Sequence, residues 1–435
     1  MSEKVLIEAE YILKWEDGLE IIPQGELVVE DGCITYAGPR RETKDTKKYT
    51  NIIKKEKSLV MPGLINTHTH AAMTLFRGYA DDLPLMDWLE KKIWPAEAKL
   101  DGEDVYWGTL LAICEMIRGG TTCFADMYFF MEEVARAVLE SGMRASLARG
   151  LIGLEELSSQ VAIEENKTLL KNWHGEGDGR ITVMFGPHAP YTCPPDFLKK
   201  IIALADEFHK PLHIHLAETR EEVENCYKDY GKTPVELMLE IGLFEHNVLA
   251  AHCVHLTPGD IEIISKKNVA VAHNPGSNLK LGSGNAPLSK LLQNNVLVSL
   301  GTDGAASNNN LDLFEEVRLA ALLPKGMGEN STVVPAEEAL KLATYNGAKA
   351  LYLEKETGTL REGSRADLII VNLEKPHCCP LYNPVAHLVY SAAASDVELV
   401  MVDGRILYEK GELKTVDEER IFFEARQRAF KLIKS

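Results

Sequence analysis

The chain has 435 residues, of which 45% are hydrophobic and 26% charged, as in folded globular proteins. Its 47 lysines and arginines face 65 aspartates and glutamates, and the formal net charge of −18 repels phosphate backbones and anionic membranes. We therefore expect neither nucleic acid nor a membrane as a partner. The first residues lack an apolar signal core, no stretch approaches the roughly 20 apolar residues of a transmembrane helix, and the eight cysteines are scattered. These features indicate a cytoplasmic protein with reduced thiols.

Both ends of the chain have the pattern of short β-strands. Residues 1–58 have the pattern of β-strands separated by turn residues. The same pattern of alternating apolar and polar residues recurs at 366–373 and 397–413, around Asp-Gly and Lys-Gly turns. Neither end is long enough for a good sheet alone. We therefore predict one small β-sandwich domain built from residues 1–58 and 365–435, with an amphipathic terminal helix that packs against the body of the protein.

The middle of the chain, residues 59–364, has a different pattern. Eight short apolar runs rich in Val, Ile, Leu and Ala alternate with helical spacers. Such strands belong to a parallel sheet buried on both faces, and eight of them predict a closed (β/α)8 barrel of the TIM type in an α/β protein. The runs lie at 59–70, 121–127, 144–151, 181–190, 211–218, 247–256, 268–275 and 295–304.

Polar side chains stand at the ends of these runs, where a parallel barrel builds its active site. They are His68 and His70, Asp126, Arg149, His188, His215 and Glu218, His252, His273 and Asn274, and Asp303.

The pair His68 and His70 is the first candidate for chemistry. Residues two apart on a strand point to the same face, so both imidazoles aim at one spot inside the barrel mouth. Two neutral imidazoles that converge on a point make half of a site for a divalent ion. Alone, such a pair is as often structural. His215 and Asp303, on the fifth and eighth runs, supply two further candidate ligands.

This arrangement resembles the amidohydrolase superfamily. The phrases "MPGLINTHTH", "HIHLAET", "AAHCVHL" and "LGTDGAASNNNLDLF" resemble its S-adenosylhomocysteine and 5′-methylthioadenosine deaminase branch over nearly the whole chain. The resemblance implies a metal-dependent hydrolase barrel in which His68, His70, His215 and Asp303 are the ligands. Binuclear relatives carry a carboxylated lysine on the fourth strand, and "ITVMFGPHAP" contains none, so we expect one divalent ion per subunit. Zn²⁺ is the first choice, with Fe²⁺ or Mn²⁺ as alternatives.

The resemblance also implies a reaction. Metal-bound hydroxide attacks C6 of the adenine ring of 5′-methylthioadenosine or S-adenosylhomocysteine, with adenosine as a further candidate, and ammonia leaves an inosine analogue. Asp303 accepts the proton of the attacking water and His252 orients the hydroxide. Glu218 carries a proton to the ring nitrogen beside C6. Glu218 and Asp303 are therefore expected to touch the substrate as well.

Four further substrate contacts follow from the resemblance. Trp88 covers the apolar thioether tail, Glu97 accepts hydrogen bonds from the ribose hydroxyls, and His188 meets the purine or sugar edge. Arg149 pairs with the carboxylate of a homocysteine moiety. Some members use a second arginine slightly beyond this position, but the stretch that follows Arg149 here has none. The preference between the two thioether nucleosides therefore stays open.

Several alternatives remain. The same fold and metal chemistry serve deaminases of guanine, cytosine or 8-oxoguanine and triazine chlorohydrolases, and a non-catalytic binding protein is a further alternative. A homo-oligomer is also left open. We interpret His213 as a support for a ligand and Asp126 as the cap of the following helix. His255 and His273 stay outside the ligand set, and the segment 274–287 is interpreted as a loop that lines the barrel mouth.

Overall fold

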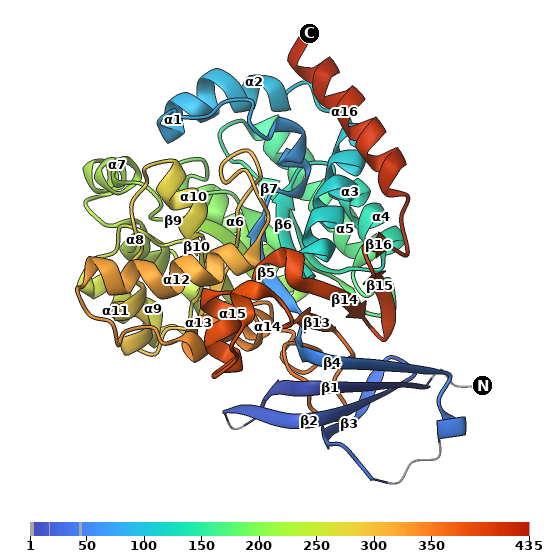
Figure 1. Ribbon diagram of the computed structural model, residues 1–435. Helices are drawn as coiled ribbons and strands as arrows, with labels where there is room; N and C mark the ends of the chain where they lie inside the picture. Colours follow the sequence, from blue (N-terminus) through green and yellow to red (C-terminus); the bar gives the residue numbers. More distant parts are fainter. Residues whose placement is uncertain (1–3, 17, 43–45, 435) are drawn as a thin grey trace.

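The computed structural model describes residues 4–16, 18–42 and 46–434, and two eight-stranded sheets organise it (Figure 1). In one of them every pair of neighbouring strands is parallel, and the strands follow in chain order. They are β5 (Leu64–Thr69), β6 (Thr121–Tyr128), β7 (Arg144–Leu151), β8 (Ile181–Pro187), β9 (Leu212–Leu216), β10 (Val248–His252), β11 (Ala270–His273) and β12 (Val298–Leu300). All eight predicted strands are confirmed.

The last strand of this sheet returns to the first. Oγ1 of Thr67 donates a 2.9 Å hydrogen bond to the carbonyl oxygen of Leu300. The amide of Asp303 donates to the carbonyl oxygen of His68, also at 2.9 Å. These bonds hold β12 beside β5, so the sheet closes as the predicted barrel.

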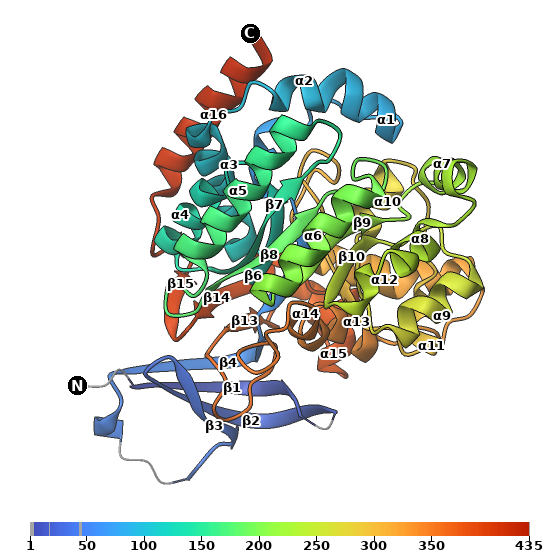
Figure 2. The same ribbon diagram turned by 180° about the vertical axis from the view of Figure 1, so that it is seen from behind.

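Helices surround the barrel, and Figure 2 shows α5 and α6 lying over strands β7 and β8. The larger helices are α3 (Gly102–Arg118), α4 (Met131–Ser141), α5 (Glu156–Trp173), α6 (Pro195–Phe208), α7 (Arg220–Tyr230), α8 (Pro234–Glu240), α9 (Pro258–Lys266), α12 (Leu313–Met327), α13 (Ala336–Leu342) and α15 (Pro384–Tyr390). Shorter helices are α10 (Pro275–Lys280), α11 (Leu288–Gln293) and α14 (Tyr345–Ala350), and 3-10 helices are η1 (Thr46–Lys48), η2 (Ala71–Phe76), η4 (Leu243–Glu245), η5 (Pro376–Cys378) and η6 (Ala394–Asp396). Local sequence sets several of the starts. Thr233 and Thr257 cap α8 and α9, and a proline follows each threonine at the first helical position.

The barrel interior below the site is filled by apolar side chains, several of them small. Ala125, Ala148, Ala251 and Ala272 are all fully buried and belong to one apolar cluster. The alternate residues of the same strands carry larger apolar groups, such as Leu147, that pack under the helices. The barrel is therefore a packed core, and polar groups gather at its carboxyl end.

The second sheet combines the two ends of the chain, as predicted. Its order is β16-β15-β14-β13-β4-β1-β2-β3, and β4 pairs with β13 in antiparallel register, with Met61 opposite Ile369. The strands are β1 (Lys4–Trp15), β2 (Leu19–Glu30), β3 (Cys33–Pro39), β4 (Asn51–Pro62), β13 (Leu368–Asn372), β14 (Val397–Val402), β15 (Arg405–Glu409) and β16 (Glu412–Leu413). The division of the chain at residues 58 and 364 stays a prediction, and β4 runs across the first of these boundaries.

Three helices complete the structure around the barrel. The short helices α1 (Leu85–Trp88) and α2 (Trp94–Glu97), joined by the π-turn η3 (Leu89–Ile93), lie at the carboxyl end of the barrel (Figure 1). The terminal helix α16 (Glu418–Lys434) packs along α3, as expected, and Arg428 forms a 2.9 Å ion pair with Asp104. The eight cysteines are free thiols. Within the described ranges, no helix is long and apolar enough to cross a membrane.

Candidate active site

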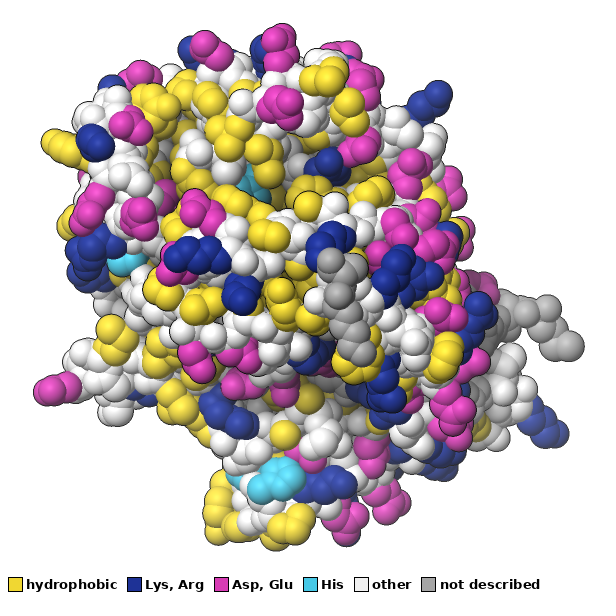
Figure 3. All heavy atoms as spheres, turned by 90° about the horizontal axis from the view of Figure 1, so that it is seen from above, with side chains coloured by type: hydrophobic (Ala, Val, Ile, Leu, Met, Phe, Trp, Pro, Cys, Tyr) yellow, Lys and Arg dark blue, Asp and Glu magenta, His cyan; other side chains and the backbone are white. Residues whose placement is uncertain are grey.

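The carboxyl ends of the barrel strands and the helices α1 and α2 enclose a pocket. It holds about 700 Å³ of space between protein atoms, including its open mouth, which is within the usual size of a small-molecule site. Figure 3 looks down on this end of the molecule and shows a histidine side chain in a hollow bordered by hydrophobic side chains. Eight of the residues predicted from sequence line the pocket: His70, Trp88, Glu97, His188, His215, Glu218, His252 and Asp303. His68 is completely buried beneath them.

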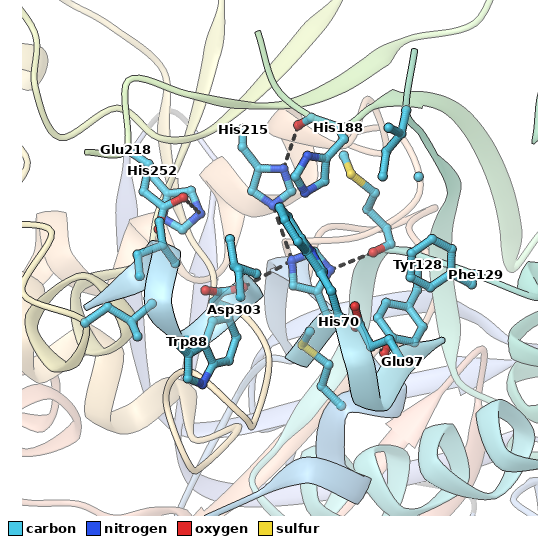
Figure 4. Close-up of a pocket in the computed structure, with 18 of the residues that line it drawn as sticks. His70, Trp88, Glu97, Tyr128, Phe129, His188, His215, Glu218, His252 and Asp303 are labelled. Carbon is cyan, nitrogen blue, oxygen red and sulfur yellow. Dashed lines mark hydrogen bonds and ion pairs between the residues drawn. The ribbon is translucent and has the colours of Figure 1, made fainter. Parts of the chain in front are cut away.

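The four predicted ligands come together at the base of the pocket, and Figure 4 shows three of them, His70, His215 and Asp303. Oδ1 of Asp303 lies 3.5 Å from Nε2 of His68 and 3.3 Å from Nε2 of His70. Nε2 of His215 lies 3.2 Å from Nε2 of His70. These atoms come from β5, β9 and the end of β12, so barrel closure is what assembles the cluster.

Hydrogen bonds on the outer side of each imidazole decide which nitrogen faces the cluster. Nδ1 of His70 donates to the carbonyl oxygen of Met127 at 2.6 Å, and Nδ1 of His215 donates to that of His188 at 2.7 Å. A carbonyl only accepts, so in the neutral ring each Nε2 carries a lone pair directed inward. Nε2 of His68 has no hydrogen-bond partner among the described residues. Lone pairs that face one another at this distance, beside a carboxylate, fit a divalent cation.

Burial keeps this cluster in the form that binds cations. It lowers the pKa of His68 to about 4 and the pKa of His215 well below its ordinary value. Burial opposes ionisation of Asp303, but the histidines around it hold its pKa well below the ordinary value of a carboxyl group. Neutral imidazoles and an ionised carboxylate are the protonation states that metal ligation requires.

Two serines and a left-handed backbone fix the direction of Asp303. Its Oδ2 accepts hydrogen bonds from Oγ of Ser277 at 2.6 Å and from Oγ of Ser307 at 2.8 Å, which leaves Oδ1 for the cluster. Asp303 has φ +62°, a conformation that residues with a side chain rarely adopt. The hydrogen bond from its backbone amide to the carbonyl oxygen of His68 holds this conformation in place. The sequence analysis did not identify either serine.

Glu218 and His252 form a second pair beside the cluster. Nε2 of His252 lies 3.8 Å from Oε2 of Glu218, and its Nδ1 lies 2.8 Å from Oδ1 of Asn278. Burial raises the pKa of Glu218. For His252, burial opposes the charged form, but Glu218 and Asp303 raise its pKa. The carboxyl group of Glu218 and the imidazole of His252 can therefore share a proton within the pocket.

The other wall of the pocket carries the residues predicted to hold a nucleoside. Oε1 of Glu97 accepts a 2.5 Å hydrogen bond from the hydroxyl of Tyr128, and burial raises the pKa of Glu97 to about 7. Trp88 is buried, and its Nε1 finds no partner within residues 46–434. Nδ1 of His188 lies 2.8 Å from Oγ1 of Thr192, so its other nitrogen is left for the pocket. Further side chains that the sequence analysis did not single out also line the pocket: Met73, Leu85, Leu89, Trp94, Met127, Phe129, Ile152, Tyr191 and Leu281.

The structure does not bring Arg149 into the pocket. Its Nε forms a 2.6 Å ion pair with Glu165 of α5, and the guanidinium also donates to the carbonyl oxygen of Gly150. Side chains alternate along β7, and Gly150 is the neighbour that lines the pocket. Arg149 is therefore on the opposite face of β7 from Gly150, and its guanidinium lies 4.9 Å from the ring centre of Phe129, which lines the pocket. In this conformation Arg149 is paired with Glu165, and its predicted pairing with a substrate carboxylate stays a prediction.

Two interpretations of other polar residues have different outcomes. Asp126 does not cap α4, whose N-cap is Phe130; instead its Oδ1 accepts from the amide of Ala71 at 2.7 Å and from Oγ1 of Thr69 at 2.8 Å. His213 does support a ligand, since its Nε2 lies 2.9 Å from Nδ1 of His68. The segment that contains α10 reaches the pocket through Leu281.

The chain is similar to known proteins over nearly its whole length. The model of the amidohydrolase family matches residues 59–407. The 5-methylthioadenosine/S-adenosylhomocysteine deaminase of Dictyoglomus turgidum is 54% identical over 99% of both chains, and the 5′-deoxyadenosine deaminase of Methanosarcina mazei is 52% identical over 99% of this chain and 98% of its own. The crystal structure of an adenosine deaminase from Xanthomonas campestris with bound zinc superposes with a TM-score of 0.94, at 35% identity and 99% coverage of both chains. Because the family model spans most of the chain and these relatives span nearly all of it, the protein belongs to the amidohydrolase family.

Proposed function

We propose that this protein hydrolyses the 6-amino group of adenine nucleosides and releases ammonia and the inosine analogue. The observation that carries the proposal is the convergence of His68, His70, His215 and Asp303 next to Glu218, in a pocket whose opposite wall holds Glu97. The names of the full-length relatives support an adenine ring as the group acted on.

A divalent cation, with zinc as the first choice, would be held by Nε2 of the three histidines and by Oδ1 of Asp303. When bound, such an ion acts as a Lewis acid and lowers the pKa of water to about 7. Zinc in the related adenosine deaminase structure supports this choice.

The residues of the chain then divide the proton transfers. Asp303 is ionised and faces the cluster, so it can accept a proton from the attacking water. Glu218 has a raised pKa, which lets its carboxyl group carry a proton to N1 of the purine, next to the carbon that is attacked. His252, close to Glu218, orients the water, and the same proton relay serves the departing amine.

The nucleoside end of the pocket favours a short, uncharged 5′ substituent. Glu97 accepts hydrogen bonds from the ribose hydroxyls, His188 meets the edge of the sugar or purine, and Trp88 covers the thioether. Among the described residues that line the pocket, none is a lysine or an arginine. Arg149, the residue predicted to pair with a carboxylate, forms an ion pair with Glu165 in this conformation. This arrangement supports 5′-methylthioadenosine and 5′-deoxyadenosine as better substrates than S-adenosylhomocysteine. A cytoplasmic location and a homo-oligomeric state stay predictions.

An ultraviolet assay tests the proposal. Purified protein with its zinc content measured is incubated with 5′-methylthioadenosine, 5′-deoxyadenosine, S-adenosylhomocysteine, adenosine and guanine, and both the change from adenine to hypoxanthine absorbance and ammonia release are followed. We expect turnover of the adenine nucleosides, with the methylthio and deoxy compounds ahead of S-adenosylhomocysteine. Zinc-loaded protein that deaminates guanine but none of the nucleosides would overturn the proposal.

A further inference from the structure

The turn that carries Glu218 into the pocket has an unusual backbone. It follows β9 directly, and Ala217, the residue before Glu218, has φ +51°, in the left-handed region that favours glycine. The carbonyl oxygen of Ala217 accepts hydrogen bonds from the amides of Val254 and His255, at 3.0 and 2.9 Å. One side of the turn is therefore fixed to the segment after β10.

The other side of the turn is held by one buried carboxylate. Oε1 of Glu222 accepts a 2.9 Å hydrogen bond from the amide of Ala217, and Oε2 accepts a 2.8 Å hydrogen bond from the amide of Glu218. The side chain of Glu222 is 6% exposed, and it is outside the set of described residues that line the pocket. It contacts the backbone of the acid and not the space where a substrate would lie.

The position of Glu222 in its helix differs from an ordinary capping arrangement. Thr219 is the N-cap of α7, and its Oγ1 accepts a hydrogen bond from the amide of Glu222 at 3.1 Å. In a capping box, the acidic residue at this third helical position returns a hydrogen bond to the amide of the N-cap residue. Here the carboxylate reaches past Thr219 to the two preceding amides, so the start of α7 and the turn of Glu218 form one unit.

We infer that Glu222 is a positioning residue for the reaction: its two carboxylate oxygens hold the amides of Ala217 and Glu218, and so aim the side chain of Glu218 at the purine. The inference rests on the proposed function, because Glu222 acts through Glu218. Two amide donors need two acceptors. A glutamine of the same shape supplies one oxygen and one amino group, and the amino group would face a donor, which leaves one buried N–H without a partner.

The test compares Glu222→Gln with Glu221→Gln. The control removes an acidic group from the same first turn of α7, but Glu221 is exposed. With 5′-methylthioadenosine, Glu222→Gln is expected to lower kcat by about 10- to 100-fold, since small misplacements of a catalytic group have effects of this size. KM and the zinc content are expected to stay near those of the control. A kcat equal to that of Glu221→Gln would overturn the inference.

A double-mutant cycle separates positioning from a general weakening of the fold. In a Glu218→Gln background, Glu222→Gln is expected to change the residual kcat little, because the group that it positions is already lost. Loss of kcat by the same factor in both backgrounds would contradict the inference. Glu222→Asp, which keeps the charge but is too short to reach both amides, provides a milder variant with an intermediate kcat.

Backbone hydrogen exchange gives a result that does not depend on the substrate. Glu222→Gln is expected to speed exchange in the peptide that contains Ala217 and Glu218, while Glu221→Gln leaves it unchanged. Unchanged exchange in Glu222→Gln would overturn the positioning role even if the protein is an active deaminase. Faster exchange in a protein that turns over no nucleoside would instead support the positioning role and reject the proposed function.

Discussion

The hydroxyl of Tyr128, the last residue of β6, donates a 2.5 Å hydrogen bond to Oε1 of Glu97, the last residue of α2. The bond joins a barrel strand to the short helices at the barrel mouth. In Figure 4, Glu97 and Glu218 stand on opposite sides of the pocket, with the ligand cluster between them. Tyr128 therefore fixes the position of Glu97, and with it the distance between Glu97 and Glu218 that a bound nucleoside has to span.

Removing this donor is expected to move the pH dependence of substrate binding. Burial raises the pKa of Glu97 to about 7, and the bond from Tyr128 works in the opposite direction. In Tyr128→Phe the pKa of Glu97 rises further, so a smaller fraction is ionised at neutral pH and KM for nucleosides increases. Since the ionised acceptor is lost as pH falls through this pKa, the acid limb of kcat/KM is expected at higher pH in the variant.

The measurement is the profile of kcat/KM from about pH 5.5 to 9 for wild type and variant. Tyr191→Phe serves as the control, because Tyr191 also lines the pocket but the bond to Glu97 comes from Tyr128. An acid limb at the same pH in Tyr128→Phe and wild type would contradict the prediction.

Glu218→Gln is expected to abolish most turnover and keep the metal. Glutamine fills the same space but cannot deliver a proton, and general acid–base groups typically contribute about 10²- to 10⁴-fold to rate. Glu218 lies outside the predicted ligand set, so zinc per chain stays at the wild-type value. The two quantities to measure are kcat and bound zinc. A variant with full activity would remove Glu218 from the proton relay, and a variant without zinc would make it a ligand.

His213 is expected to control zinc affinity through His68. Its Nε2 lies 2.9 Å from Nδ1 of His68, and its own Nδ1 has no partner in the described part of the chain. When Nε2 of His68 binds a cation, Nδ1 of His68 carries the proton and donates a hydrogen bond to Nε2 of His213. Loss of such a support usually weakens metal binding by about 10- to 100-fold.

Competition with a chelator checks this expectation without any assay of activity. His213→Leu removes the acceptor and is expected to release zinc at a lower chelator concentration, whereas His213→Gln keeps an oxygen acceptor and loses less affinity. His273→Leu is the matched control, since His273 is equally buried but lies on β11, away from His68 in the hydrogen-bond network. Equal zinc retention in His213→Leu and His273→Leu would count against the role.

Periodicity along the strands explains why much of the site could be predicted. Barrel strands are continuous apolar runs, so a polar residue at their carboxyl ends is conspicuous, and His68, His70, His215 and Asp303 were found in this way. Alternation also forces His68 and His70 to the same side of β5. The pairing of the two chain ends followed because neither end could form a sheet by itself.

The partners of Arg149 and of Asp126 depend on information that strand periodicity does not contain. Arg149 was assigned by resemblance, and its partner Glu165 is known only once α5 is placed beside β7. Asp126 was judged as a helix cap from its position alone. Its partners are Thr69, the last residue of the neighbouring strand β5, and Ala71, the first residue of η2, and both are fixed only by the three-dimensional pairing.

A buried ion pair at the opposite end of the barrel is expected to stabilise the protein without affecting catalysis. Nε of Arg144, the first residue of β7, lies 2.7 Å from Oδ2 of Asp367, whose Oδ1 also accepts a hydrogen bond from the amide of Asp403 at 2.8 Å. Asp367 precedes β13 and its carbonyl oxygen accepts from the amide of Gly63, between β4 and β5. The pair therefore connects the barrel to the sheet built from the chain ends.

Arg144→Met leaves the carboxylate of Asp367 buried without its cation, which typically costs about 3–5 kcal/mol of stability. Lys266→Met is the comparison, because it breaks an ion pair with Glu262 in which both side chains are mostly exposed, and such pairs contribute about 0–1 kcal/mol. Urea unfolding with saturating zinc measures the stability of both variants, and kcat is expected to be unchanged in the folded variants since Arg144 is at the amino end of its strand.

Adding Asp367→Asn to Arg144→Met is expected to recover part of the lost stability, because the unpaired charge is then removed. Equal unfolding midpoints for Arg144→Met and Lys266→Met would show that the buried pair holds the two sheets together no better than a surface pair does.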